Sequence, residues 1–422
     1  MKETLARKNN MKLYPYYMMF AYDLLFYYAI RIMFFADVVN IPEYQIVMLS
    51  ALYCLFRIIV QFPLTIVVTY IGKRNGTILG NIINIFSMIF VIFSQNFGMA
   101  LFAQFLSAAA FSLKDVSEAN LLTESIPESK GRADIFTRID TKGFKWHCIF
   151  SALTSAASGF LYSVNMYLPM VLCLFMVVIS TIISFNFEDI VHEKEKKEKK
   201  MTAKEYYREL KKGIKLSVNS KRLRTLLIFS GIVSGALTIF DLYKLTLMQD
   251  IGMNAGVIGA AYALFILLKG LYSSRAIKIN KMFRNRTLSN ILLIFAVSFI
   301  FMGIVALLNF EFVTKSVIIV LILLILSAIS GMFLIVIKKY FNNFANDKIL
   351  APIYMIKSIV FNIFASVITF AGSGTLKILN IKYAIIVLGF IFLFVALVLT
   401  NYSKDKLGLD PSEYNKKDIY KA

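Results

Sequence analysis

The chain has 422 residues, of which 58% are hydrophobic and only 17% charged, with a mean hydropathy of +0.69, and this balance excludes a soluble globular domain. The formal net charge of +21 would favour nucleic-acid binding in a soluble protein. Here Lys and Arg lie mostly in short segments between apolar runs, as the positive-inside bias of membrane proteins requires, and no aromatic-plus-basic module for nucleic acid is present.

Long apolar runs follow one another along the chain, and most are near the roughly twenty residues that span a bilayer as a helix. The charged stretch 1–12 precedes the first run, which is too long for a signal peptide and has no small-residue cleavage site, so we interpret it as a membrane span. About twelve spans are predicted, at 13–35, 45–70, 76–95, 97–120, 146–164, 167–187, 223–247, 255–276, 288–308, 314–337, 350–372 and 381–400.

The spans fall into two groups of six, which predicts an all-α integral membrane protein built from two six-helix halves, 1–187 and 223–402. A cytoplasmic linker, 188–222, separates them. It starts with a charge run and continues with a capping-box pattern at Thr202 that predicts a helix, which we place at the lipid headgroups in preference to a partner-binding role. A polar tail, 403–422, ends the chain.

Loop charge predicts the orientation. The N-terminus, the loops after even-numbered spans, the linker and the tail hold most of the Lys and Arg residues, whereas the opposite loops hold few. Both termini and the linker are therefore expected in the cytoplasm.

The first two spans carry ionisable side chains near the middle of the membrane, where each costs roughly 2.5–3.5 kcal/mol and needs a partner or a cavity. Helical spacing places Asp23 and Arg31 on one face of span one, and Arg57 and Gln61 on one face of span two. Asp23 and Arg57 are predicted to pair, either as a structural ion pair or as part of a substrate or coupling site.

Span four aligns Gln104, Asp115 and Glu118 on one face, and Lys114 can pair with Glu118 four residues on. These charges fit an inner gate, or a helix end whose side chains reach the interface, which is the interpretation we prefer.

Three further candidates for transport or coupling occur in the second half. Asp241 lies in span seven, Lys269 in span eight and Lys357 in span eleven. Lys269 could hold an anionic substrate, or it could form a structural pair with Asp241.

The chain resembles the major facilitator superfamily, above all bacterial members of unassigned substrate. The likeness rests on Gln61-Phe-Pro63-Leu-Thr65 in span two, on Asn120-Leu-Leu-Thr-Glu124-Ser-Ile126 after span four, and on the small-residue fifth span from Ser151 to Gly159. The resemblance implies a monomer in the bacterial plasma membrane, with the third helix of each triplet facing lipid and the first lining the cavity.

The signature loop of the family after span two is only partly kept. Gly72, Lys73 and Arg74 remain as a gating-loop remnant, whereas Thr69 and Tyr70 replace the Asp and Arg that lock the inner gate in the family. The span-four arginine linked to proton coupling in many drug exporters falls at Gln104. These departures weaken the prediction of a standard proton-driven drug antiporter.

We expect a secondary transporter that moves a small organic solute by alternating access, with Asp23 or Asp241 as candidates for proton-coupled efflux. The alternative is a transporter-like protein with a sensing or assembly role. A membrane enzyme is disfavoured, because His147 and His192 have no paired motif around them. We expect no cofactor: three cysteines without C-x-x-C spacing predict no metal or disulfide, and no phosphate-binding loop occurs.

Overall fold

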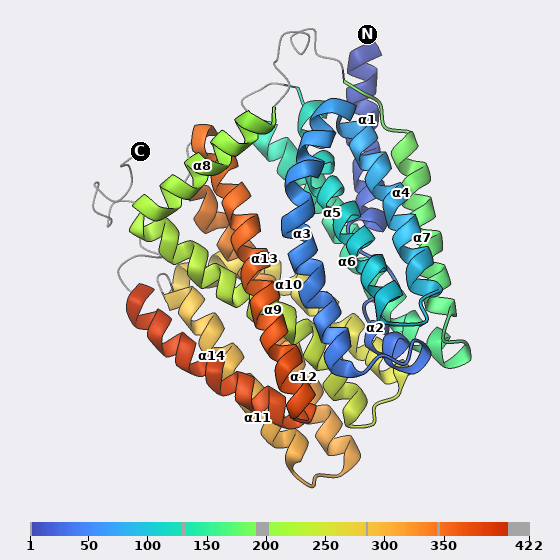
Figure 1. Ribbon diagram of the computed structural model, residues 1–422, viewed down its shortest axis with the longest axis vertical. Helices are drawn as coiled ribbons and strands as arrows, with labels where there is room; N and C mark the ends of the chain where they lie inside the picture. The colour runs from blue at the N-terminus through green and yellow to red at the C-terminus, as the bar shows by residue number, and fades with distance from the viewer. Residues whose placement is uncertain (1, 128–131, 191–201, 284–285, 344–346, 404–422) are drawn as a thin grey trace. The chain divides into compact units, whose positions relative to one another are not determined.

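A computed structural model describes residues 2–127, 132–190, 202–283, 286–343 and 347–403, and across these residues the chain is helical and contains no strand (Figure 1). Ten helices are long and apolar enough to cross a membrane. They are α3 (Glu43–Ile71), α4 (Lys73–Ile92), α5 (Phe97–Ser125), α7 (Leu168–Phe185), α9 (Lys221–Asp250), α10 (Ala255–Phe283), α11 (Thr287–Leu307), α12 (Phe312–Asn343), α13 (Asp347–Ile378) and α14 (Ile381–Ser403). The prediction of an all-helical, multi-pass membrane protein is confirmed.

Each of these ten helices coincides with a predicted span. The two other predicted spans differ from the structure in different ways. The span at 146–164 belongs to α6 (Arg132–Val164), which begins 14 residues earlier, so the basic stretch expected to be a loop is helical.

The predicted span at 13–35 is not one helix. α1 (Lys2–Ala21) ends at Ala21, residues 22–30 form turns, and the chain then continues as α2 (Arg31–Met33) and a π-helical turn, η1 (Phe34–Val38). Phe26 has a φ of 63°, which no regular helix contains. The expected single face that carried Asp23 and Arg31 is therefore wrong.

Two side-chain contacts replace the helical hydrogen bonds at this break. The Lys114 ammonium donates to the carbonyl of Ala21, one of the acceptors that a helix end leaves unsatisfied. The Asp23 carboxylate accepts the N–H of Leu24 at 3.0 Å, a local bond that competes with the helix. Irregular backbone within a span is tolerated where it is buried in protein or lines a cavity.

The chain divides into two compact units. Unit 1 comprises Met1–Ile41, Leu52–Ala203 and Ala255–Ala263. Within it α4 packs against α5 and α7, and α1 packs against α5, α6 and α7 (Figure 1). Its core cluster combines buried residues of α1, of α5 and of the chain just beyond each of α5 and α7: Tyr14, Tyr17, Met18, Ala21, Leu121, Leu122, Ile126 and Phe187.

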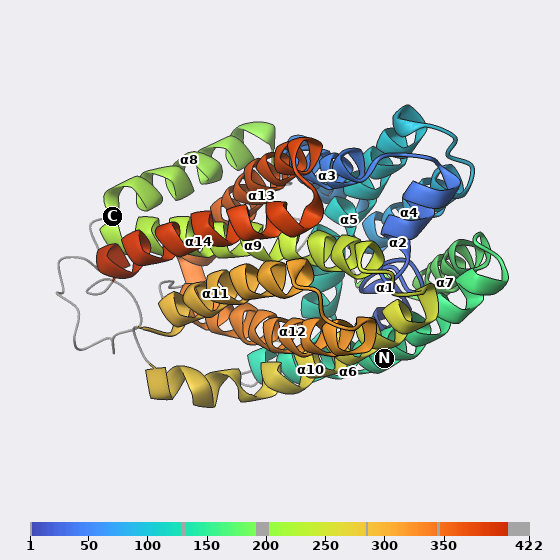
Figure 2. The ribbon, with the colours of Figure 1, turned by 90° about the horizontal axis from the view of Figure 1, so that it is seen from below.

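Unit 2 comprises Pro42–Ala51, Lys204–Asn254 and Leu264–Ala422. Within it α9 packs against α13, and α11 packs against α12 and α14 (Figure 2). Phe295 and Phe299 stack with ring centroids 4.7 Å apart, and both contact Phe240 and Phe392 edge-on or tilted. This unit also contains α8 (Ala203–Asn219), the helix predicted in the linker, whose Leu210 and Leu216 pack against its core.

The third helix of each predicted triplet, namely α4, α7, α11 and α14, exposes large apolar side chains. Phe86 of α4, Phe175 of α7, Phe301 of α11 and Phe394 of α14 are each more than half exposed. Such surfaces are stable against lipid but not against water, which agrees with the expectation that these helices face the bilayer. The charged start of the linker (191–201) and nearly all of the tail (404–422) lie outside the described residues.

Candidate functional site

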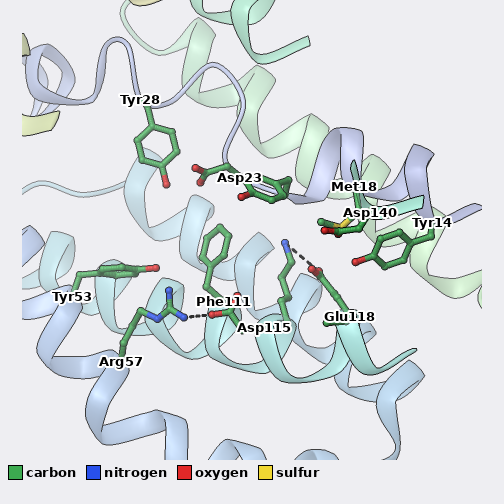
Figure 3. Close-up of a pocket in the computed structure, with 13 residues that line it drawn as sticks. Tyr14, Met18, Asp23, Tyr28, Tyr53, Arg57, Phe111, Asp115, Glu118 and Asp140 are labelled. Carbon is green, nitrogen blue, oxygen red and sulfur yellow. Dashed lines mark hydrogen bonds and ion pairs between the residues drawn. The ribbon is translucent and has the colours of Figure 1, made fainter. Parts of the chain in front are cut away.

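A pocket of about 430 Å³ opens in unit 1 beside the break after α1 (Figure 3). This volume lies in the range of sites that bind small molecules. Side chains from α1, from the turns that follow it, and from α3, α5 and α6 line the pocket: Tyr14, Met18, Tyr22, Asp23, Tyr28, Tyr53, Arg57, Phe111, Lys114, Asp115, Glu118, Ala119 and Asp140. Four predicted site residues, Asp23, Arg57, Asp115 and Glu118, are therefore brought together.

The partner predicted for Arg57 is wrong. Its guanidinium pairs with the Asp115 carboxylate of α5, not with Asp23, although all three side chains line the same pocket (Figure 3). The cause is the break in span one: once the helix ends at Ala21, Asp23 no longer lies on the helical face that the prediction assumed. Asp115 faces Arg57 from an unbroken helix instead.

Lys114 and Glu118 line the pocket and belong to a buried polar network. The predicted pair is present, with the Lys114 ammonium 3.7 Å from the Glu118 carboxylate. Tyr17 donates to the same carboxylate at 2.5 Å, and Asn81 donates to the Tyr17 hydroxyl at 2.9 Å. Glu118 is 9% exposed, so our preferred interpretation, in which this side chain reaches the membrane interface, is wrong.

The Arg57–Asp115 pair is expected to contribute little to stability. The side chains of Arg57 and Asp115 are 21% and 59% exposed toward the pocket, where water can screen the pair, and ion pairs screened by water are worth about 0–1 kcal/mol. We expect Arg57→Gln to change the thermal unfolding midpoint in detergent only slightly, as measured with a thiol-reactive dye that reports exposure of the buried Cys54 and Cys173. A large fall in the midpoint would contradict this and make the pair a structural one.

The gating-loop remnant joins the ends of several helices. Gly72 precedes α4 with a φ of 87°, a conformation that favours glycine. Lys73 pairs with Glu124 near the end of α5, and Arg74 donates to the carbonyls of Phe187 at 2.5 Å and Phe185 at 3.0 Å. These contacts tie the start of α4 to the ends of α5 and α7.

The other predicted residues of unit 1 lie outside the pocket lining. Arg31 stacks its guanidinium over the ring of Tyr28, 5.2 Å from the centroid. The Gln104 side-chain amide donates to the Tyr27 hydroxyl at 3.4 Å. Gln61 lies on α3, where its backbone carbonyl accepts a hydrogen bond from the Thr65 hydroxyl.

In unit 2 the alternative pair of Lys269 with Asp241 is wrong, because Asp241 pairs with Lys244 at 2.5 Å. Lys244 is buried and also contacts the rings of Phe240 and Phe265. Lys269 lies on α10, where its backbone packs against Gly331.

Lys357 is surrounded by aromatic rings. Its ammonium lies over Phe341, Tyr354 and Phe361, between 4.9 and 5.3 Å from each centroid. Such contacts stabilise a cation where few water molecules reach it.

Several pocket residues were missed by sequence reasoning. Asp140 lies in a stretch that was predicted to be a loop, whereas the structure places it on α6, where it lines the pocket. Tyr22 and Tyr28 belong to the turns after Ala21, and no Gly or Pro occurs between 22 and 30 to signal a break. No group of three or more His, Cys, Asp or Glu side chains that could hold a metal occurs in the part of the chain that the structure describes.

Comparison with known proteins identifies the architecture. The family model described as Major Facilitator Superfamily matches residues 16–348. No curated protein matches the chain in sequence. Among solved structures, the nucleoside transporter NupG superposes with a TM-score of 0.68 at 11% identity, covering 95% of this chain and 99% of that one.

Two other solved transporters are similar. A POT family transporter in complex with 5-aminolevulinic acid gives a TM-score of 0.61 at 17% identity, covering 95% of both chains. The peptide transporter POT in complex with sulfate gives 0.63 at 12% identity, covering 96% of this chain and 95% of that one. At these identities the likeness shows a shared fold. The match over most of its length makes this chain a member of the Major Facilitator Superfamily.

Proposed function

We propose that the protein is a secondary transporter that moves a small organic solute across the membrane by alternating access, with the pocket beside Asp23 as its solute site. The observation that carries this proposal is the charged pocket beside an interrupted span. Membrane transporters use interrupted helices to form substrate sites, because the free backbone groups and nearby charges can bind a ligand there. Ionisable side chains at membrane depth are costly and commonly mark substrate or ion pathways.

The finer features of the proposal follow from the sequence. The cytoplasm holds both termini, the linker 188–222 and the tail 403–422. During transport the halves 1–187 and 223–402 move relative to each other. The protein acts as a monomer in a bacterial plasma membrane. Its partners are the lipid bilayer and the solute, and nucleic acid is not among them. Proton-coupled efflux uses Asp23, because its carboxylate faces the pocket.

Transport is tested with protein reconstituted into liposomes under an imposed pH gradient, by measuring uptake from a mixed pool of metabolites and cationic compounds. We expect gradient-dependent uptake of at least one compound, reduced at least tenfold in Asp23→Asn, since a charge-assisted contact is worth roughly 1.5–3 kcal/mol. Glu311→Gln, an exposed carboxylate between α11 and α12, should transport like the unmodified protein. Uptake that is equal in Asp23→Asn would remove this residue from the mechanism.

A sensing or assembly role is the second candidate, favoured by the replacement of the gate-locking residues with Thr69 and Tyr70. In that case no compound is taken up by folded protein. The double variant Asp23→Asn with Arg57→Ala then keeps its cellular function, whereas deletion of the linker abolishes it.

A further inference from the structure

The charges that line the pocket are unevenly balanced. Four carboxylates face two basic side chains, in a chain whose overall charge is strongly positive. Both basic side chains are already engaged, Arg57 by Asp115 and Lys114 by Glu118. The lining therefore carries more carboxylates than basic side chains, opposite in sign to the net charge of the whole protein.

Asp23 has acceptor capacity that the protein does not use. Its carboxylate accepts the N–H of Leu24, and the Tyr28 hydroxyl points toward it (Figure 3). Among the described residues no basic side chain pairs with it. An ionised carboxylate can accept about four hydrogen bonds, so further donors from a ligand can be accommodated.

Aromatic side chains share the pocket with this carboxylate. Tyr22, Tyr28, Tyr53 and Phe111 line the pocket together with Asp23. Two cations of the protein already use such rings, since Lys114 lies 4.8 Å from the centroid of Phe111 and the Arg31 guanidinium lies 5.2 Å from that of Tyr28. A carboxylate beside aromatic faces is the combination that recognises an organic ammonium group.

The end of α1 lies close to the same carboxylate. α1 ends at Ala21, two residues before Asp23, and its last turn carries partial negative charge, part of which Lys114 already neutralises by donating to the carbonyl of Ala21. A cation bound at Asp23 is therefore stabilised mainly by the carboxylate and the ring faces, whereas an anion is opposed by both.

We propose that the pocket selects an organic cation, a protonated amine on a small apolar body, with the Asp23 carboxylate as its counter-ion. This inference rests on the proposed function in taking the pocket as the solute site, and it adds the chemical class of the solute. The cavity of about 430 Å³ limits the solute to a small molecule.

Three compounds of similar shape and different charge test this: 2-phenylethylamine, 3-phenylpropionate and 2-phenylethanol. Binding is measured on the purified full-length protein in lipid nanodiscs by titration calorimetry, at neutral pH and with no gradient. We expect the amine to bind at least tenfold more tightly than the alcohol or the anion, since a hydrogen bond to a charged group is worth that much. In Asp23→Asn the amine should bind at least tenfold more weakly, and Asp23→Glu should restore part of the affinity.

Asp250→Asn is the matched control, because Asp250 pairs with Lys382 in unit 2 and does not line the pocket. It should bind the amine like the unmodified protein. The proposal is overturned if amine binding is undetectable, if it is unchanged in folded Asp23→Asn, or if the anion binds as tightly as the amine. It is also overturned if sodium ions compete for the site as effectively as the amine does. The two proposals can be contradicted independently. Amine binding without uptake of any compound contradicts the transporter but not the cation site. Uptake of only anionic or neutral compounds contradicts the cation site but not the transporter.

Discussion

Lys114→Met is expected to destabilise the protein more than any other single change in the pocket. The Lys114 side chain is only 3% exposed, and its ammonium contacts Glu118 and the carbonyl of Ala21. Removing it leaves a buried carboxylate without its cation, which typically costs about 3–5 kcal/mol, and takes away the donor that ends α1. The thermal unfolding midpoint in detergent should fall sharply, and solute binding should be lost with it.

The controls separate the buried charge from the loss of a lysine. Lys212→Met removes an exposed partner of Glu209 and should leave the midpoint almost unchanged. Adding Glu118→Gln to Lys114→Met removes the uncompensated charge and should recover much of the lost stability, because replacing both members of a buried pair is often close to neutral. A single Lys114→Met variant as stable as the unmodified protein would show that the network does not hold the break.

Gly159→Ala should be the second most damaging change. An added Cβ at Gly159 of α6 would lie 2.8 Å from the carbonyl carbon of Ala255 and 3.0 Å from the Cα of Gly256, both in α10. In the opposite direction, a Cβ at Gly259 would lie 2.6 Å from the carbonyl oxygen of Ser155. Small residues allow helices in membranes to pack backbone against backbone, and overpacking of this kind costs about 1–3 kcal/mol.

Gly374→Ala is the matched control for the same substitution. Gly374 lies within α13, and an added Cβ would meet nothing within 4 Å. Alanine favours a helix over glycine by about 1 kcal/mol, so this variant should be equal to or slightly more stable than the unmodified protein. If Gly159→Ala gains stability in the same way, the two helices do not depend on close approach at this point.

The site was predictable in part. Asp23, Arg57, Asp115 and Glu118 stood out because charges at membrane depth are rare, and all four line the pocket. The Lys114–Glu118 pair was predictable because its spacing within an unbroken helix fixes which side chains meet. The partner of Arg57 was not predictable, since it lies on another helix. The spacing of residues within each helix does not show which faces of two helices meet.

The sequence by itself determined ten of the membrane helices, the helical linker segment at α8 and the family. The membrane helices were predictable because every backbone group of an apolar run in a bilayer must be hydrogen-bonded within the chain, which a helix achieves. Only the tertiary structure decided the break after Ala21. No Gly or Pro occurs between 22 and 30, and at the break Lys114, on a distant helix, donates to the carbonyl of Ala21 while the Asp23 carboxylate accepts the N–H of Leu24. A contact between residues 93 positions apart leaves no local pattern in the sequence.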